Sequence, residues 1–344
     1  MTANGYRTVG RSGLVVSEVG VGASTFGRSG MAATSQAAAD AIVGRALDLG
    51  ITYFDVADAY GDEPGQSESI LGAALGARRD DVVIGSKFGV PVRGLNGADW
   101  RARGSRGYLR RAVEGSLRRL RTDYLDLYQI HVPDPTTPID ETLATLDDLV
   151  REGKILYAGS SNFAAWQVAD AEHVARASGS TRFISATNEY SLLWRDAERE
   201  LLPALAAYGI GFFPYFPLQN GLLTGKYRAD AAPAGAKITN LKAHLFEQAP
   251  WDALERYREF AHDRGVTETA LAIGWLLAQP TVSSVIAGVT RPEQLDDNLA
   301  ASRWRPTPDD VDELARILPG DLSGAPGRET GAVATPTRRE EVAA

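Results

Sequence analysis

Residues 107–131 read GYLRRAVEGSLRRLRTDYLDLYQIH, a stretch that predicts one helix followed directly by one strand. Apolar side chains recur at helical spacing over Gly107–Leu120, and Leu125–His131 is a short apolar run. A helix that alternates with a buried strand in this way is typical of proteins built on parallel sheets. This stretch therefore predicts an α/β fold.

The same alternation extends along the chain in both directions. Apolar runs that predict strands lie at Val19–Gly22, Thr52–Asp55, Val82–Lys87, Leu125–His131, Ile155–Ser160, Phe183–Asn188, Ile210–Tyr215 and Ser284–Gly288. Runs that predict helices lie at Gln36–Leu49, Ser67–Leu75, Gly107–Leu120, Glu141–Arg151, Ala165–Arg176, Ala197–Ala207 and Thr267–Ala278. Two architectures fit this pattern, a closed barrel and an open doubly wound sheet, and the eight predicted strands favour a (β/α)8 TIM barrel.

Three segments lie outside this repeat. Tyr6–Val9 and Leu14–Val16 flank the turn residues 10–13 and predict a β-hairpin that closes the bottom of the barrel. The longest connection, Gln219–Pro250, predicts a loop over the active face. We expect one barrel domain over residues 1–320 and a disordered tail over residues 321–344, where Gly, Pro, Thr and charged residues dominate.

Composition excludes several classes of function. The chain has 344 residues, no cysteine and a formal charge of -8. The charge argues against a nucleic-acid partner, which would need clustered Lys and Arg. Without cysteine there is no thiolate nucleophile and no cysteine metal site, and the four histidines lack zinc-ligand spacing, so we expect no metal. We find no secretory signal and no membrane-spanning run, and expect a cytoplasmic protein; its oligomeric state stays open.

Three consecutive predicted strands end in ionisable residues. They are Asp55, Lys87 and His131, with Tyr60 on the loop that follows Asp55. In a barrel, the carboxyl ends of the strands form the active face, so these four side chains would converge. Any one of them alone is read more simply as part of an ion pair or as a capping histidine. Their occurrence at three successive strand ends favours a catalytic site.

These four residues suit proton transfer to a carbonyl group. Tyrosine has an ordinary pKa near ~10, and a neighbouring ammonium lowers that pKa by stabilising the phenolate. A carboxylate behind the lysine keeps the lysine charged, and a neutral imidazole can orient a carbonyl oxygen. Because none of these groups supplies a hydride, the site needs a hydride donor.

Several motifs resemble the aldo-keto reductase family. They are Asp55-Val56-Ala57-Asp58-Ala59-Tyr60-Gly61, Ser86-Lys87-Phe88-Gly89 and Asp123–His131, and the resemblance runs in order from about Tyr6 to about Leu318. It implies a catalytic tetrad of Asp55, Tyr60, Lys87 and His131. It also implies NADP(H) bound across the C-terminal face without a Rossmann fold, in agreement with the lack of a Gly-x-Gly-x-x-Gly motif between a strand and a helix.

The resemblance also assigns residues to the cofactor. Ser161 and Asn162 would bind the nicotinamide carboxamide, and Thr187 stands where the family usually has a third ligand, a glutamine. Tyr215 would stack on the nicotinamide ring, and Lys226 would meet the pyrophosphate. Thr290 and Arg291 suit a 2′-phosphate, because guanidinium groups pair with phosphate in a bidentate manner, and they favour NADP over NAD. The remaining predicted contacts are Ala23, Ser24, Asp55, Phe216, Pro217, Leu218, Gly288, Gln294, Asp297 and Asn298.

Three functions remain open at this stage. The leading prediction is a reductase of an uncharged aldehyde or ketone, with a pocket walled by Phe26, Tyr60, Phe88 and His131. The second is a cofactor-sensing regulatory subunit, like the potassium-channel β subunits that share the resemblance; these carry an asparagine where this chain has His131. The third is a sugar or alcohol dehydrogenase that uses the same site in the oxidative direction.

Overall fold

The computed structural model describes residues 5–30, 34–232 and 243–320. An eight-stranded parallel sheet runs in the order β10-β3-β4-β5-β6-β7-β8-β9. Its strands are β3 Val19–Gly22, β4 Tyr53–Asp55, β5 Val83–Phe88, β6 Leu125–Ile130, β7 Ile155–Ser161, β8 Phe183–Glu189, β9 Gly211–Tyr215 and β10 Val285–Gly288. Each matches a predicted strand to within one residue at either end.

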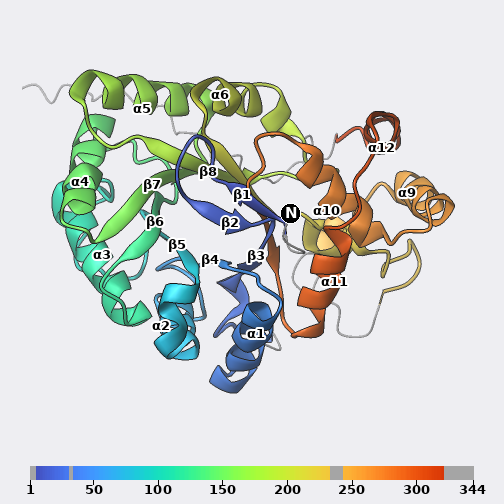
Figure 1. Ribbon diagram of the computed structural model, residues 1–344, viewed down its shortest axis with the longest axis horizontal. Helices are drawn as coiled ribbons and strands as arrows, with labels where there is room; N and C mark the ends of the chain where they lie inside the picture. Colours follow the sequence, from blue (N-terminus) through green and yellow to red (C-terminus); the bar gives the residue numbers. More distant parts are fainter. Residues whose placement is uncertain (1–4, 31–33, 233–242, 321–344) are drawn as a thin grey trace, which may run out of the picture.

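Helices follow the strands and surround the sheet (Figure 1). The α-helices are α1 Gln36–Asp48, α2 Gln66–Leu75, α3 Arg106–Leu120, α4 Ile139–Arg151, α5 Ala165–Ser178, α6 Leu201–Tyr208, α8 Ala243–Glu247, α9 Trp251–Asp263, α10 Glu268–Ala278, α11 Glu293–Ala301 and α12 Pro308–Ile317. Short 3-10 helices are η1 Ala23–Thr25, η3 Gly76–Asp81, η4 Asp196–Glu198 and η5 Gln219–Thr224.

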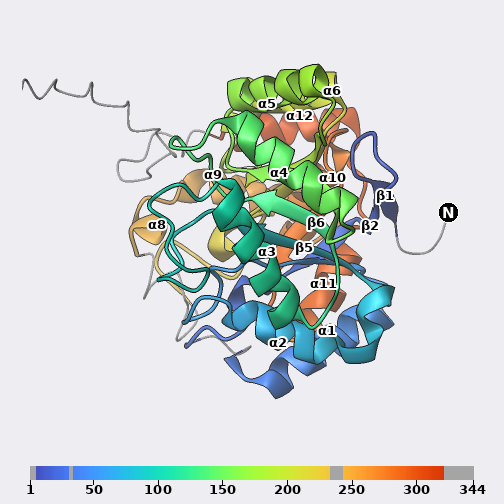
Figure 2. The ribbon, with the colours of Figure 1, turned by 90° about the vertical axis from the view of Figure 1, so that its left-hand side faces the viewer.

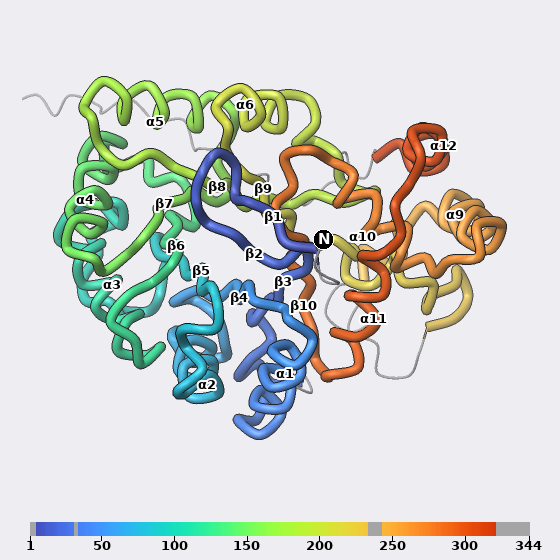
Figure 3. Tube along the Cα trace, viewed as in Figure 1, coloured from blue at the N-terminus to red at the C-terminus, as the bar shows by residue number. Residues whose placement is uncertain are grey.

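The two edge strands of the sheet meet, so the sheet curls into a nearly closed barrel. Phe212 of β9 donates its N–H to the carbonyl oxygen of Thr281 (2.8 Å) and accepts from the N–H of Ser283 (2.9 Å), just before β10. Figure 3 shows the resulting ring of strands viewed along its axis. The predicted (β/α)8 TIM barrel is therefore confirmed, and the open doubly wound sheet is excluded.

An antiparallel hairpin of β1 Tyr6–Thr8 and β2 Val15–Ser17 lies across one end of the ring (Figures 1 and 2). Val9, Leu14 and Val16 of this hairpin are buried and form a small core with side chains from the barrel strands, among them Tyr53 and Phe213. The hairpin thus closes the amino-terminal end of the barrel, as predicted. It leaves the carboxyl ends of the strands as the open face, where α8 lies (Figure 2).

The helical predictions need three corrections. The predicted helix Ala197–Ala207 is interrupted at Glu200, whose φ of -138° is not helical, so η4 and α6 are separate. Pro203 fits the first turn of α6, because the amides there have no partner within the helix. Sequence reasoning also missed α9 and α12, although α12 begins with a capping box from Thr307 to Asp310.

The remaining predictions about organisation fall partly outside the described residues. The tail over residues 321–344 lies there, as do residues 233–242 of the long connection. The described flanks of that connection contain η5 and α8. The predicted extent of a single domain, residues 1–320, stays a prediction.

Candidate active site at the carboxyl ends of the strands

Every strand of the barrel delivers at least one predicted site residue to the same end of the sheet. Asp55 is the last residue of β4, Lys87 is the penultimate residue of β5, and His131 follows β6 directly. Parallel strands place their carboxyl ends at one edge, so residues far apart in the sequence become neighbours. Those from the other strands are Ala23 and Ser24 after β3, Ser161 and Asn162 at the end of β7, Thr187 in β8, Tyr215 in β9 and Gly288 in β10.

Lys87 is the centre of the site. Its ammonium lies 2.6 Å from Oδ1 of Asp55, 3.1 Å from the carbonyl oxygen of Val56 and 3.4 Å from Oη of Tyr60. An ammonium has three donors, and here each has an acceptor. Because Tyr60 accepts from Lys87, its own O–H remains available to donate to a substrate. Asp55 and Lys87 are buried, whereas Tyr60 and His131 are partly exposed above them.

The charges in the site have opposing effects on the phenol of Tyr60. Burial raises the pKa of Tyr60 above its ordinary value of 10.0, the charge of Lys87 lowers it, and the carboxylate of Asp55 raises it again. Burial dominates, so the structure does not give the expected net lowering of this pKa. Burial also opposes the charge of Lys87, but the attraction of Asp55 and Tyr60 prevails and raises the pKa of Lys87. At neutral pH the site therefore holds a phenol and an ammonium.

His131 completes the group. Its ring meets that of Tyr60 edge to face, with 5.7 Å between the ring centroids. Burial and the charge of Lys87 lower the pKa of His131 to about 3, so its imidazole is neutral at physiological pH. Its Nδ1 is buried and makes no hydrogen bond within the described part of the chain. A neutral imidazole beside a phenol can orient a carbonyl oxygen by hydrogen bonding.

A second cluster connects the ends of β7, β8 and β9. Asn162 has a left-handed backbone (φ 60°) and accepts at Oδ1 from the hydroxyl of Tyr215 (2.8 Å). Its Nδ2 donates to the carbonyl oxygen of His131 (2.9 Å), which links this cluster to the tetrad. Ser161 donates to the carbonyl oxygen of Thr187 (2.9 Å). The resemblance assigns these amide and hydroxyl groups to the nicotinamide carboxamide, and this assignment stays a prediction.

A third cluster is cationic. Burial and the nearby charge of Arg291 lower the pKa of Lys226. Neither side chain forms an ion pair with an acid among the described residues. Two neighbouring cations without a counter-charge fit an anion such as a phosphate. Gln294, in the first turn of α11, holds the preceding loop through Oε1, which accepts from the backbone N–H of Thr290 (2.7 Å) and of Arg291 (3.2 Å).

The structure places the other predicted residues without testing their roles. Phe26 and Phe88 are fully buried in the main core, where Phe88 stacks on Tyr128 with 4.8 Å between the ring centroids. Their part in a substrate pocket stays a prediction. Further predicted cofactor contacts vary in exposure: Ala23, Pro217 and Asn298 are buried, Ser24 and Leu218 are half-buried, and Phe216, Gly288 and Asp297 are exposed.

Sequence reasoning missed three buried polar residues below the site. Gln129, on β6, accepts at Oε1 from the hydroxyl of Thr187 (2.7 Å). Asp58 lies between Asp55 and Tyr60 and accepts at Oδ2 from Nδ2 of Asn96 (2.7 Å). All three are almost fully buried. The only signal in the sequence is that polar residues interrupt otherwise apolar runs, which does not show whether they face the interior.

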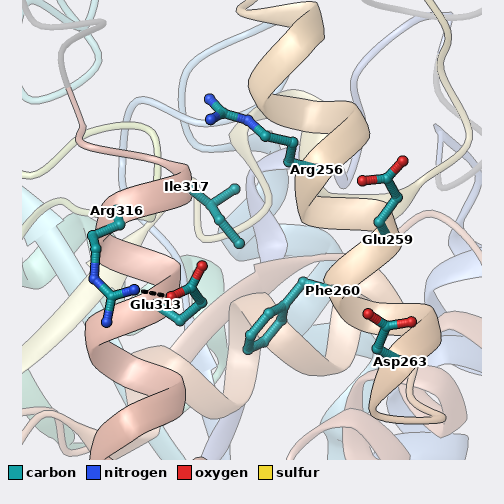
Figure 4. A pocket seen from close by; sticks show the side chains of 7 residues that line it. All are labelled: Arg256, Glu259, Phe260, Asp263, Glu313, Arg316 and Ile317. Carbon is teal, nitrogen blue, oxygen red and sulfur yellow. Dashed lines mark hydrogen bonds and ion pairs between the residues drawn. The ribbon is translucent and has the colours of Figure 1, made fainter.

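A hollow between α9 and α12 lies apart from the tetrad (Figure 4). The residues that line it do not belong to the predicted site. They are Arg256, Glu259, Phe260, Asp263, Glu313, Arg316 and Ile317.

Within the described ranges, no three His, Asp or Glu side chains gather as metal ligands, and no helix there is long and apolar enough to cross a bilayer.

Comparisons with known proteins agree with the geometry. The model of the aldo/keto reductase family matches residues 18–319. An uncharacterized oxidoreductase of Bacillus subtilis (strain 168), YrpG, is 38% identical and covers 94% of this chain and 98% of its own. An L-glyceraldehyde 3-phosphate reductase of Escherichia coli (strain K12) is 34% identical, covering 86% and 87%. A probable voltage-gated potassium channel subunit beta of Oryza sativa subsp. japonica is also 34% identical, covering 91% and 96%.

Proposed function

The chain belongs to the aldo/keto reductase family, and from this premise we propose that it reduces an aldehyde or ketone to an alcohol with NADPH. The observation that carries the proposal is the set of contacts of Lys87, which joins Asp55 at 2.6 Å and the hydroxyl of Tyr60 at 3.4 Å. A phenol held by a buried ammonium is a proton donor whose conjugate base is stabilised in place.

Each side chain of the tetrad has a distinct task in this proposal. A bound reduced nicotinamide supplies the hydride that adds to the carbonyl carbon. Tyr60 gives its proton to the carbonyl oxygen as negative charge develops there, and Lys87 stabilises the phenolate that remains. Asp55 keeps Lys87 charged and fixed. His131, which is neutral, donates a hydrogen bond that orients the carbonyl oxygen toward Tyr60.

Two clusters suit the parts of an NADP(H) molecule. Ser161, Asn162 and Thr187 offer hydroxyl and amide groups for the carboxamide, and Tyr215 offers a ring beside them. The cations Lys226 and Arg291 suit the phosphates, and Arg291 favours the 2′-phosphate that distinguishes NADP from NAD. The carbonyl substrate is a small molecule. The name of the Escherichia coli relative makes L-glyceraldehyde 3-phosphate one substrate to include in a panel.

The regulatory alternative is supported by the potassium-channel names of several relatives. Against it stands the complete tetrad, because the resemblance implies an asparagine in the channel subunits where this chain has His131. Oxidation of an alcohol or sugar uses the same groups in reverse, and the supply of oxidised and reduced cofactor decides between the two directions.

The test follows loss of NADPH absorbance with a reactive aromatic aldehyde and with glyceraldehyde 3-phosphate, for the wild type and for Tyr60→Phe. We expect aldehyde-dependent turnover in the wild type and a loss of about 10²- to 10⁴-fold in the variant, the range of general-acid catalysis. Binding of NADPH without turnover across a carbonyl panel would favour the regulatory alternative. Failure to bind any nicotinamide would reject both.

A further inference from the structure

Asp58 occupies a critical place in the backbone that carries Tyr60. Its N–H donates to the carbonyl oxygen of Lys87 (3.1 Å), and its carbonyl oxygen accepts from the N–H of Gly65 (2.6 Å). Two residues later, the N–H of Tyr60 donates to the carbonyl oxygen of Ala57 (3.2 Å). Asp58 therefore ties the loop of the proton donor to the strand of the catalytic lysine. A displacement of Asp58 would be transmitted to both residues.

The side chain of Asp58 extends this tie to a second loop. It is fully buried, and its Oδ2 accepts from Nδ2 of Asn96 (2.7 Å), itself almost fully buried. The carbonyl oxygen of Asn96 accepts in turn from Nε of Arg111 on α3 (3.0 Å). The other carboxyl oxygen, Oδ1, is buried and makes no hydrogen bond among the described residues. A single amide is thus the whole polar support of this carboxyl group.

Among the described residues, no cation without a partner faces Asp58. The charged groups that face it are Glu68 on α2, Arg119 on α3 and Lys87 on β5, and the phenols Tyr108 and Tyr128 are close by. Arg119 is paired with Glu68, its Nε lying 2.7 Å from Oε2, and Lys87 is paired with Asp55. An ionised Asp58 would therefore be a second buried carboxylate beside Glu68, with neither counter-charge free.

These surroundings determine the protonation state. Burial and the charge of Glu68 raise the pKa of Asp58 to about 8, against the smaller opposing effects of Asn96, Arg119 and Lys87. By comparison, the pKa of His131 lies at about 3 and burial raises that of Tyr60 above 10.0. Of these three groups, Asp58 is the one whose pKa lies nearest to neutral pH.

We propose that Asp58 is a positioning residue that works in its protonated form, and that its ionisation releases the Tyr60 loop and sets the upper pH limit of the reaction. The effect of Asp58 on the reaction rate rests on the proposed function, whereas its protonation state does not. A neutral carboxyl group can stay in this buried position between Asn96 and the catalytic loop. A carboxylate there is repelled by Glu68 and is more stable in water. Its movement toward solvent would displace the backbone that holds Tyr60 and Lys87.

The kinetic test compares kcat/KM between pH 6 and pH 9.5 in the wild type and in Asp58→Asn, which imitates the neutral form. We expect the wild-type value to fall about tenfold per pH unit above the transition, and the variant to lose that fall over the same range. Glu68→Gln is the opposing variant, because removing its charge stabilises ionised Asp58 and moves the fall to lower pH. An alkaline limb that stays unchanged in both variants would overturn the proposal.

The protonation test needs no turnover. Infrared difference spectra between wild type and Asp58→Asn should contain the C=O stretch of a protonated carboxyl group at pH 6, which disappears with a midpoint near the kinetic one. If Asp58→Asn does not fold, the same band is followed in Glu68→Gln. A lower midpoint pH for its disappearance in that variant identifies the band as that of Asp58. Absence of the band at pH 6 would also overturn the proposal. Absence of turnover with the band present would reject the proposed reductase function and the kinetic role, but not the neutral carboxyl group.

Discussion

Replacing Lys87 by methionine should separate the stability of the site from its catalysis. The side chains of Lys87 and Asp55 are 1% and 6% exposed, with 2.6 Å between Nζ and Oδ1. Removing only the cation leaves Asp55 buried without a partner, a change that typically costs about 3–5 kcal/mol. The carboxyl group can avoid this by taking up a proton. The ordinary pKa of this carboxyl group, 3.8, lies about three units below pH 7, and protonating the group costs about 1.4 kcal/mol for each of these units.

The expected loss of unfolding free energy is therefore about 4 kcal/mol at pH 7. It should shrink to about 2 kcal/mol at pH 5, where protonating Asp55 is easier. The sign follows from linkage: a carboxyl group whose folded-state pKa is raised loses stability as pH rises from its unfolded pKa toward its folded pKa. The double variant Lys87→Met/Asp55→Asn has no buried charge, so its stability should recover to within about 1–2 kcal/mol of wild type and lose this pH dependence.

Urea unfolding at pH 5 and pH 7 measures the stabilities, and NADPH oxidation with an aldehyde measures the activities. Both the single and the double variant should lose about 10²- to 10⁴-fold in kcat/KM, because neither retains the cation that stabilises the Tyr60 phenolate. Equal destabilisation of Lys87→Met at the two pH values would refute the account of an orphaned carboxyl group. Restored activity in the double variant would refute the role of Lys87 in catalysis.

Three further predictions concern the rest of the site. His131→Leu should lower kcat/KM by about 10²-fold, the cost of losing one donor at a developing oxyanion, and the wild-type rate should show no histidine titration between pH 5 and pH 7, because the pKa of His131 is about 3. Arg291→Ser should raise the Kd for NADPH by about 10- to 100-fold and leave that for NADH unchanged; exposed Arg303→Ser is the matched control, and equal losses for both cofactors would contradict the assignment. Thr187→Gln should lower the Kd for NADPH by about fivefold if it adds one hydrogen bond to the carboxamide, and unchanged binding in a calorimeter would argue against that contact.

Much of the barrel could be predicted from local patterns. The strands were predicted to within a residue because short apolar runs bounded by turns leave little freedom in parallel sheets, whose strands are buried on both faces. The break at Glu200 was missed because the apolar pattern continues across it. α9 is missing from the predicted helices, although Leu254, Tyr257 and Ala261 follow helical spacing in the segment that comes after the long connection.

The sequence by itself determined which residues meet at the open face. Once strands alternate with helices in a parallel barrel, the carboxyl ends of all strands share one edge, so the positions of Asp55, Lys87 and His131 at strand ends bring them together. Only the tertiary structure decided their protonation states and partners. The pKa of Asp58 depends on Glu68 and Asn96. The hydroxyl of Thr187 donates a hydrogen bond to Gln129, which lies 58 residues away in the sequence. Such contacts arise from burial and from distances between segments that local patterns do not encode, and the electrostatic energies of the site depend on both.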